Sequence, residues 1–239
     1  MNDLSYRFVA AGLQDFIWGG ELTGEENLPE KGPAIFVANH LRALGPIAVV
    51  SSVPFRLYPW VASNMLDEHL AAEYLRWDFV ERQLHLPMPY SLWLAKAISR
   101  LSVPLLNSLG GIPVFPNPDQ SQATFEPSVN LLVQGKIVLV FPEDPSQPID
   151  PLCEMSPFKK GFARLGELYF QRSGGFIQFY PLAVHGRRRC VQVGRPVTYN
   201  PFALAVNERL RIKRLLETSI HEMLLGMGRD TYLGVPLPH

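Results

Sequence analysis

Apolar residues recur along this chain in two patterns, one typical of helices and the other of buried strands. Helical spacing predicts helices at 4–18, 64–84, 91–106 (bent or ended at Pro104), 123–136 and 207–225, with a shorter one at 46–53. Short continuous apolar runs bounded by Gly, Pro or charged residues predict strands at 34–39, 56–62, 110–115, 137–141, 176–184 and 190–197. Residues 156–171 form a loop that leads into another helix, and the polar connector 19–33 has room for a short strand.

This alternation of strands and helices predicts an α/β protein with a mostly parallel central sheet flanked by helices. The 239 residues suffice for one sizeable core, and they contain no internal repeat or low-complexity tract. We therefore expect a single domain over residues 1–239. Its N-terminal helix and connector would occupy 1–28, and its C-terminal helix 207–225.

Composition and charge narrow the class of protein. Hydrophobic residues make up 47% of the chain and charged residues 18%, as in a folded globular protein. The 22 basic residues balance the 22 acidic ones, so we expect no nucleic-acid partner. No apolar run has the length of a membrane span, and the N-terminus shows no cationic leader. We expect a cytoplasmic protein, and peripheral contact with the inner membrane face is an alternative. Helix 4–18 is a candidate for such membrane contact, and packing into the core is the competing interpretation of its apolar surface.

The two cysteines, Cys153 and Cys190, form neither a CxxC motif nor a metal-ligand spacing. Two reduced thiols are the favoured interpretation, and one disulfide is the alternative. We expect no metal and no bound cofactor.

Four short motifs follow one another in order: "NHLRALGP" from Asn39, "LGGIPVF" around Gly111, "VFPEDP" with "PFKKG" after it, and "YPLAV". Their order and spacing resemble the glycerophospholipid acyltransferase superfamily, whose best-known members are the lysophosphatidate acyltransferases. The resemblance covers roughly residues 29–196. It implies that acyl-CoA or acyl-ACP serves as co-substrate and that the partners are an acyl thioester and a lipid-like acceptor.

In that superfamily a histidine acts as general base, an aspartate after four intervening residues orients it, and arginines bind the phosphate of the acceptor. His40 is present here, but Gly45 occupies the aspartate position, and Pro116 and Ser146 occupy the arginine positions. Gly and Pro are acceptable at a helix start, so we expect Gly45 as N-cap and Pro46 as first helical residue. The fold tolerates the change, whereas loss of the acid weakens the case for catalysis.

The residues expected at the site fall into two groups. The catalytic group is His40, Glu143 and Asp144, with the hypothesis that Asp144 or Glu143 supplies the missing acid to His40. The substrate-binding group is Asn39, Arg42, Gly111, Phe141, Pro142, Lys159, Lys160 and Gly161. The three arginines of "HGRRRC" (185–190) are either a solvated turn or a replacement phosphate site.

The resulting functional hypothesis is an acyltransferase-like protein that moves a fatty acyl group to a hydroxyl or amine. Because both phosphate-binding arginines are replaced, lysophosphatidate is not the expected acceptor. The alternative is a catalytically inactive relative that binds acyl chains or lysolipids, or serves as a scaffold. A thioesterase that uses water as acceptor is a third option.

Overall fold

A computed structural model describes residues 2–41 and 44–232 of the chain. The contacts divide the chain into two compact units. The smaller unit is Tyr58–Ser128, and the larger one combines Asn2–Leu57 with the part of the chain that follows Ser128. Both boundaries fall inside an element, one in a strand and one in a helix. The sequence shows no linker at either boundary.

The larger unit holds most of the strands and the longest helix. Its elements in chain order are α1 (Asp3–Leu13), β1 (Glu21–Thr23), β2 (Ala34–Ala38), α2 (Leu44–Ser52), β5 (Ile137–Val140), α7 (Arg164–Ser173), β6 (Gln178–His185), β7 (Cys190–Val193), β8 (Val197–Thr198) and α8 (Ala205–Tyr232). A π-helical segment, Gln14–Trp18, continues α1.

The strands of this unit pair in the order β1-β7-β6-β2-β5, and β8 pairs with β6. Strand β2 runs parallel to both of its neighbours, β5 and β6, and β1 runs parallel to β7. Only β7 and β8 run antiparallel to β6 among these pairings. The prediction of a mostly parallel sheet in an α/β fold is confirmed.

Strand β2 lies at the centre of the core. All five of its residues are fully buried, as are Val138 and Leu139 of β5 and Leu182 of β6. A parallel strand is covered on both faces, which explains why its sequence is a continuous apolar run rather than an alternating one. The C-terminal end of β2 is therefore flanked by a paired, buried strand on either side.

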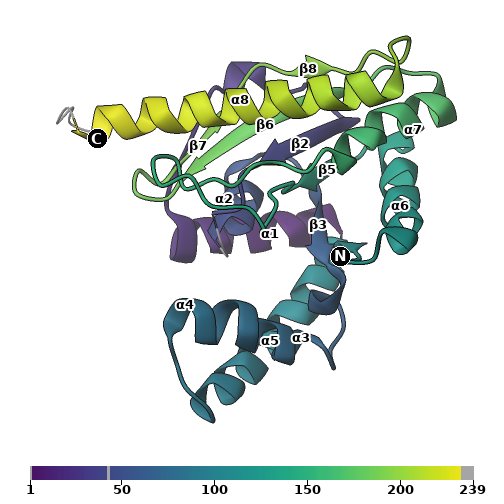
Figure 1. The fold of residues 1–239 in the computed structure, drawn as a ribbon. Coiled ribbons are helices and arrows are strands. Elements are labelled where there is room, and N and C mark those ends of the chain that lie inside the picture. Colours follow the sequence, from purple (N-terminus) through teal and green to yellow (C-terminus); the bar gives the residue numbers. More distant parts are fainter. Residues whose placement is uncertain (1, 42–43, 233–239) are drawn as a thin grey trace. The chain divides into compact units, whose positions relative to one another are not determined.

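Helices cover the sheet on both sides. Figure 1 shows α8 running along one side of the sheet, with α1 and α2 on the other. Helix α8 packs on β6 through a stripe of buried residues at four-residue spacing, Ile212, Leu216 and Ile220. Helix α1 buries only Tyr6 among its residues, whereas Leu4 and Phe8 are exposed.

The smaller unit is mainly helical. Its elements are β3 (Leu57–Ala62, starting at the boundary), α3 (Ala71–Leu75), α4 (Arg82–Leu84), α5 (Tyr90–Leu109), β4 (Ile112–Val114) and α6 (Ser121–Val133, ending in the larger unit). Strands β3 and β4 pair in parallel, and α3 packs on α5. Leu75, Val80 and Ala95 form its buried centre.

Several element bounds differ from the sequence prediction. The helix expected at 64–84 begins at Ala71, because the side chain of Asp67 accepts the backbone N–H groups of His69 and Leu70 and closes a turn there. Pro104 does not end α5, which continues to Leu109. Helix α8 begins and ends outside the expected bounds of 207–225.

Candidate active site

The motif that contains His40 and the motif that contains Glu143 both belong to the larger unit, and they lie at the same end of its parallel strands. His40 follows β2 by two residues, and Glu143 follows β5 by three. The strands are parallel and in register, with Val37 opposite Val140, so their carboxyl ends coincide. This edge is where open α/β sheets bind their ligands. His40 is exposed there.

Glu143 reaches the backbone of His40. Its Oε1 accepts the His40 N–H at 2.6 Å, and its Oε2 accepts the Ser156 N–H at 2.9 Å. Burial raises the pKa of the Glu143 carboxyl, and the two backbone hydrogen bonds work in the opposite direction. The carboxylate therefore ties the turn after β2 to the loop after β5, and it holds the main chain of His40 in place.

Asn39 acts inside the sheet. Its side chain is 0% exposed; Nδ2 donates to the Val184 carbonyl at 3.0 Å, and Oδ1 accepts the Val184 N–H at 2.7 Å. This pair of bonds continues the β2–β6 ladder by one step beyond Ala38. Asn39 was expected to bind substrate, but its amide is used to join β2 to β6.

Phe141 lies beside the imidazole. The rings of His40 and Phe141 meet edge to face with their centroids 5.2 Å apart. The next residue, Pro142, is buried, and its carbonyl accepts the Lys159 N–H at 2.8 Å. Both residues thus shape the wall next to His40, and the packing positions of the third motif form part of the site.

The carboxylate of Asp144 makes its hydrogen bonds within its own loop. Its Oδ1 accepts from the hydroxyl of Ser146 at 2.7 Å and from the Ser146 N–H at 3.1 Å, and it lies 3.4 Å from Lys159 Nζ. The Ser146 hydroxyl, followed by its amide, lowers the pKa of Asp144, and Lys159 adds to the effect. Within the described part of the chain, neither Asp144 nor Glu143 makes a hydrogen bond to the imidazole ring of His40. The hypothesis that either acid orients the imidazole receives no support from these contacts.

Lys160 and Gly161 are exposed at the start of the turn that leads into α7. The space around Gly161 is open, so nothing in its surroundings requires glycine. Their substrate-binding role stays a prediction. Arg42 lies outside the described residues. Gly111 belongs to the smaller unit, where it precedes β4 and packs against Leu66 and Val61.

Gly45 is the second residue of α2, because the helix begins at Leu44 instead of at Pro46. A Cβ on Gly45 would lie 2.0 Å from the carbonyl oxygen of His40 and 2.5 Å from its carbonyl carbon. Real Cβ atoms do not approach backbone so closely, so the loop leaves no room for a side chain here. Glycine at this position is required by the close approach of α2 to His40.

The arginine run 187–189 forms a turn with internal contacts. The Arg188 N–H donates to His185 Nδ1 at 3.2 Å, and its guanidinium donates to the Met227 carbonyl of α8 at 3.3 Å. Burial lowers the pKa of His185, and the charge of Arg188 adds to the effect. Arg187 lies 4.0 Å from Glu154. Two of the three guanidinium groups therefore have partners within the chain.

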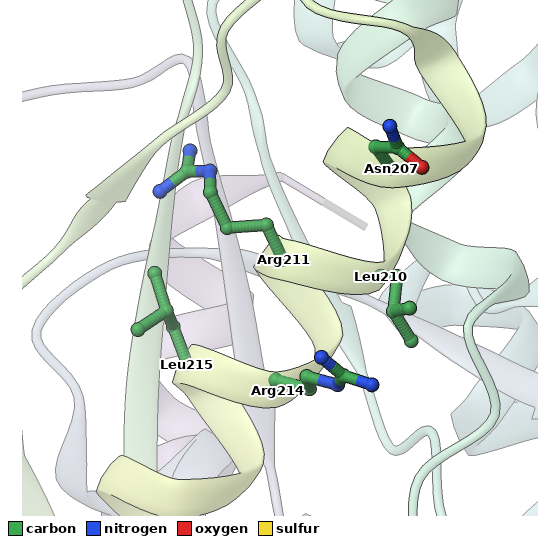
Figure 2. Close-up of a pocket in the computed structure, with 5 residues that line it drawn as sticks. All are labelled: Asn207, Leu210, Arg211, Arg214 and Leu215. Atoms are coloured by element: carbon green, nitrogen blue, oxygen red, sulfur yellow. The ribbon is translucent and has the colours of Figure 1, made fainter.

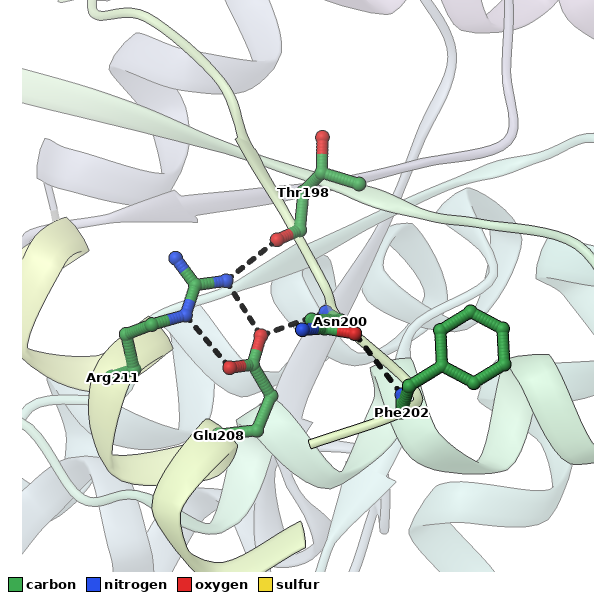
Figure 3. A network of polar contacts seen from close by, with 5 residues as sticks. All are labelled: Thr198, Asn200, Phe202, Glu208 and Arg211. Carbon is green, nitrogen blue, oxygen red and sulfur yellow. Dashed lines mark hydrogen bonds and ion pairs between the residues drawn. The ribbon is translucent and has the colours of Figure 1, made fainter. Parts of the chain in front are cut away.

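Sequence reasoning missed a buried acid in the first turn of α8. Glu208 is 2% exposed and accepts from the Asn200 N–H at 2.7 Å and from Arg211 Nε at 2.7 Å, and Arg211 also donates to the Thr198 carbonyl (Figure 3). Burial alone would raise the pKa of Glu208, but the bonds from Arg211 and Asn200 lower it. Arg211, which a sequence pattern alone would place on a solvated face of the helix, thus fastens α8 to the segment around β8.

The larger unit has two surface pockets whose lining residues do not include His40. One follows a single side of α8 and is lined by Asn207, Leu210, Arg211, Arg214 and Leu215 (Figure 2). The other lies between β1, β7 and α8, with Thr23, Gln192 and Met223 among its lining residues. Both are separate from the edge of the sheet that carries the motif residues.

One group of side chains in the described part of the chain has the donor atoms to hold a metal ion: Asp150, Cys153 and His221. The sequence did not predict this group, because His221 on α8 is 71 residues from Asp150, which lies in the loop between β5 and α7. Cys153 and Cys190 are both free cysteines.

The fold is similar to a solved structure. The crystal structure of the 1-acyl-sn-glycerophosphate (LPA) acyltransferase PlsC from Thermotoga maritima aligns with a TM-score of 0.54 and 15% sequence identity, over 93% of this chain and 83% of that chain. At this identity the likeness concerns the fold. No protein-family model matches the chain, and no curated protein matches its sequence. Over the described residues, no helix has both the length and the apolar character that crossing a membrane requires.

Proposed function

We propose that this protein transfers a fatty acyl group from a thioester, acyl-CoA or acyl-ACP, to a hydroxyl or amine acceptor, with His40 as the general base. The observation that carries the proposal is the placement of His40. It is exposed at the carboxyl end of the central strand, and its backbone N–H is held at 2.6 Å by Glu143 from the loop after the neighbouring strand. The similarity of fold to an acyltransferase structure supports the same reaction class.

In the proposed reaction an imidazole nitrogen of His40 takes the proton of the acceptor as the acceptor oxygen or nitrogen attacks the thioester carbonyl carbon. The carbon–sulfur bond breaks, the imidazolium returns the proton to the leaving thiolate, and an ester or amide and a free thiol result. A general base of this kind contributes about 10²–10⁴ in rate. Glu143 acts as a positioning residue through the His40 backbone.

The acceptor is proposed to lack a phosphate monoester. The loop that would bind phosphate in the resembling superfamily here carries Asp144, whose negative charge is paired with Lys159 at 3.4 Å. Ser146, at an arginine position of that pattern, donates its hydroxyl to Asp144. An acidic headgroup would meet a carboxylate in this loop without the guanidinium fork that suits a phosphate.

A second candidate, a catalytically silent protein that binds acyl chains or lysolipids, is favoured by Gly45. This position has neither a carboxylate nor space for one. In a hydrolase with a comparable His–Asp pair, replacing the aspartate by asparagine lowers kcat about 10⁴-fold. Such a loss would bring the rate of this protein close to that of a pure binding protein.

Thiol release from acyl-CoA and acyl-ACP, measured with and without neutral alcohols, amines and lysophospholipids, separates these functions. We expect acceptor-dependent release, a decrease of about 10²–10⁴-fold in His40→Ala, and no change in the control His69→Ala. His69 is exposed in the smaller unit. Equal rates in His40→Ala and wild type would contradict the proposal. Saturable acyl-CoA binding without release would select the silent protein, and release without any acceptor would select a thioesterase.

Peripheral membrane contact is proposed to accompany this activity through α1. Phe8 of α1 and Phe16 of the following π-helical segment are exposed, Phe16 to 90%. Exposed aromatic residues of this kind suit the interface of a bilayer. Co-sedimentation with anionic and neutral vesicles, compared between wild type and Phe8→Ser/Phe16→Ser, tests it. Equal sedimentation of the two proteins would contradict it.

A further inference from the structure

The loop between β5 and α7 closes into a tight turn at Asp150. The Asp150 N–H donates to the Met155 carbonyl at 2.9 Å, and the Glu154 N–H donates to the Asp150 carbonyl at 2.8 Å. Oδ1 of Asp150 accepts the Leu152 N–H at 2.9 Å. These bonds fold residues 150–155 back on themselves, so that the buried thiol of Cys153 returns to the carboxylate three residues before it.

Helix α8 brings a third donor to this turn. Nε2 of His221 lies 3.3 Å from Oδ2 of Asp150, the oxygen that is not used by the turn. The donor atoms of Asp150, Cys153 and His221 all lie within 4.8 Å of one another. Cys153 is 6% exposed, whereas the side chains of Asp150 and His221 are more than a third exposed. The cluster therefore has a buried sulfur at its base and an opening to solvent at its rim.

We propose that Asp150, Cys153 and His221 bind a zinc-type divalent cation, with a fourth position open to water. Zinc bonds to sulfur, nitrogen and carboxylate oxygen are about 2.0–2.3 Å long, so tetrahedral ligand atoms lie roughly 3.3–3.8 Å apart. The Asp150–His221 pair is already at 3.3 Å. All three donor atoms lie within 4.8 Å of one another, so the distances to Cys153 must shorten by no more than about 1 Å to complete the set.

The donor set determines the class of ion. Magnesium and calcium prefer oxygen ligands throughout, whereas a thiolate and an imidazole select zinc and related transition metals. Binding replaces the S–H bond of Cys153 by a sulfur–metal bond and releases the proton to the buffer. The bound divalent ion is then balanced by one thiolate and one carboxylate, so the site is neutral with the imidazole uncharged.

Other contacts hold the loop against α8 whether or not an ion is bound. One turn before His221 on α8, Oε1 of Glu217 accepts the Phe158 N–H at 2.6 Å, which fixes the far end of the same loop to the same helix. Between these two points the loop contacts Glu143 through the Ser156 N–H. A bound ion would add a second fastening between α8 and the loop whose other contacts hold Glu143.

Titration of metal-free, reduced protein with zinc chloride in competition with a chromophoric chelator tests the proposal. We expect one ion per chain and the release of a proton on binding. The apparent Tm should rise with zinc concentration, because the ion binds the folded state. Cobalt(II) should give the visible bands of a tetrahedral site together with a thiolate-to-cobalt charge-transfer band.

The variants Cys153→Ser, His221→Gln and Asp150→Asn each remove one ligand and change little volume. Loss of a residue that merely supports a ligand costs 10–100-fold in affinity, so loss of a ligand should cost about 100-fold or more. Cys153→Ser should also abolish the charge-transfer band. The matched controls are Cys190→Ser, at the other free thiol, and His69→Ala, at an exposed histidine of the smaller unit. Both should bind like wild type.

Four results would overturn the proposal. These are no stoichiometric binding at micromolar zinc, a cobalt complex without the thiolate band, ligand variants that bind as tightly as wild type, and controls that lose affinity equally. Any of them would leave the Asp150–His221 contact as a hydrogen bond at the surface. Because every readout is metal binding or thermal stability, the result is independent of whether the protein transfers acyl groups.

Discussion

Replacing Gly45 by alanine adds one methyl group where α2 approaches the carbonyl of His40. The new Cβ would lie 2.0 Å from that oxygen, whereas ordinary contacts begin at 3.4 Å, so the two atoms must move apart by about 1.4 Å. The neighbour is backbone and cannot rotate away as a side chain would. Overpacking of this kind costs about 1–3 kcal/mol, while the better helix propensity of alanine returns up to about 1 kcal/mol.

We therefore expect Gly45→Ala to destabilise the protein by about 2 kcal/mol. For a chain of this size, 1 kcal/mol corresponds to about 2–4 °C in Tm, so the apparent Tm should fall by roughly 4–8 °C. Thermal and urea unfolding followed by circular dichroism measure the change, and an unchanged m-value would show that the denatured state is the same.

Gly226→Ala is the matched control. Gly226 is exposed within α8, and nothing lies within 4 Å of the added Cβ. Without a clash the substitution should stabilise the helix by about 0.5–1 kcal/mol. If Gly45→Ala were as stable as wild type, the described approach of α2 to His40 would be wrong. Gly45→Asp meets the same obstacle, so we expect that it will not restore an orienting acid.

The remaining predictions concern the buried side chains of Asn39 and Glu208 and the half-buried side chain of Glu143. Asn39→Asp replaces the donor that faces the Val184 carbonyl by an acceptor, so it should lower the free energy of unfolding by about 2–4 kcal/mol, and more than Asn39→Ala does; the reverse order in urea unfolding would exclude the paired amide. Burial raises the pKa of Glu143 above 4.5, so the advantage of wild type over Glu143→Gln should shrink as pH rises from 4.5 through the raised value. The pKa of Glu208 is lowered from 4.5 despite its burial, so the advantage over Glu208→Gln should shrink as pH falls below 4.5. Urea unfolding on both sides of pH 4.5 should give opposite slopes for these two pairs, and equal slopes would refute the assigned environments.

Local sequence pattern predicted the central strand and the packing face of the long C-terminal helix, although not the bounds of every element in the larger unit. The run Ala34–Ala38 has strand length and no polar residue, and it is the central parallel strand with every residue buried. The spacing of Ile212, Leu216 and Ile220 places one apolar stripe on α8, and this stripe packs on β6. These features depend on the spacing of apolar side chains within one segment, and that spacing can be read from the sequence. The hypothesis that Glu143 or Asp144 serves His40 required these residues to lie close together, and the structure places Glu143 against the His40 backbone.

Sequence did not indicate which atoms of these residues meet. Asp144 or Glu143 was the hypothesised acid for His40, and the contact present in the structure joins the Glu143 carboxylate to the His40 backbone N–H across 103 positions of sequence. Asn39 was expected to face substrate, and its amide joins β2 to β6. Such outcomes depend on strand register and side-chain direction, which are decided by packing between distant segments.

The sequence alone therefore determined the α/β class, the strand that presents His40, and the replacement of the expected aspartate by Gly45. Tertiary structure decided that this glycine has no room for a side chain, because the carbonyl of His40 lies where a Cβ would be. It also decided that His221 meets Asp150 and Cys153, because α8 lies against their loop. The physical reason is one of range: periodicity acts between residues a few positions apart, whereas contacts at hydrogen-bond distance join residues that only the packed chain brings together.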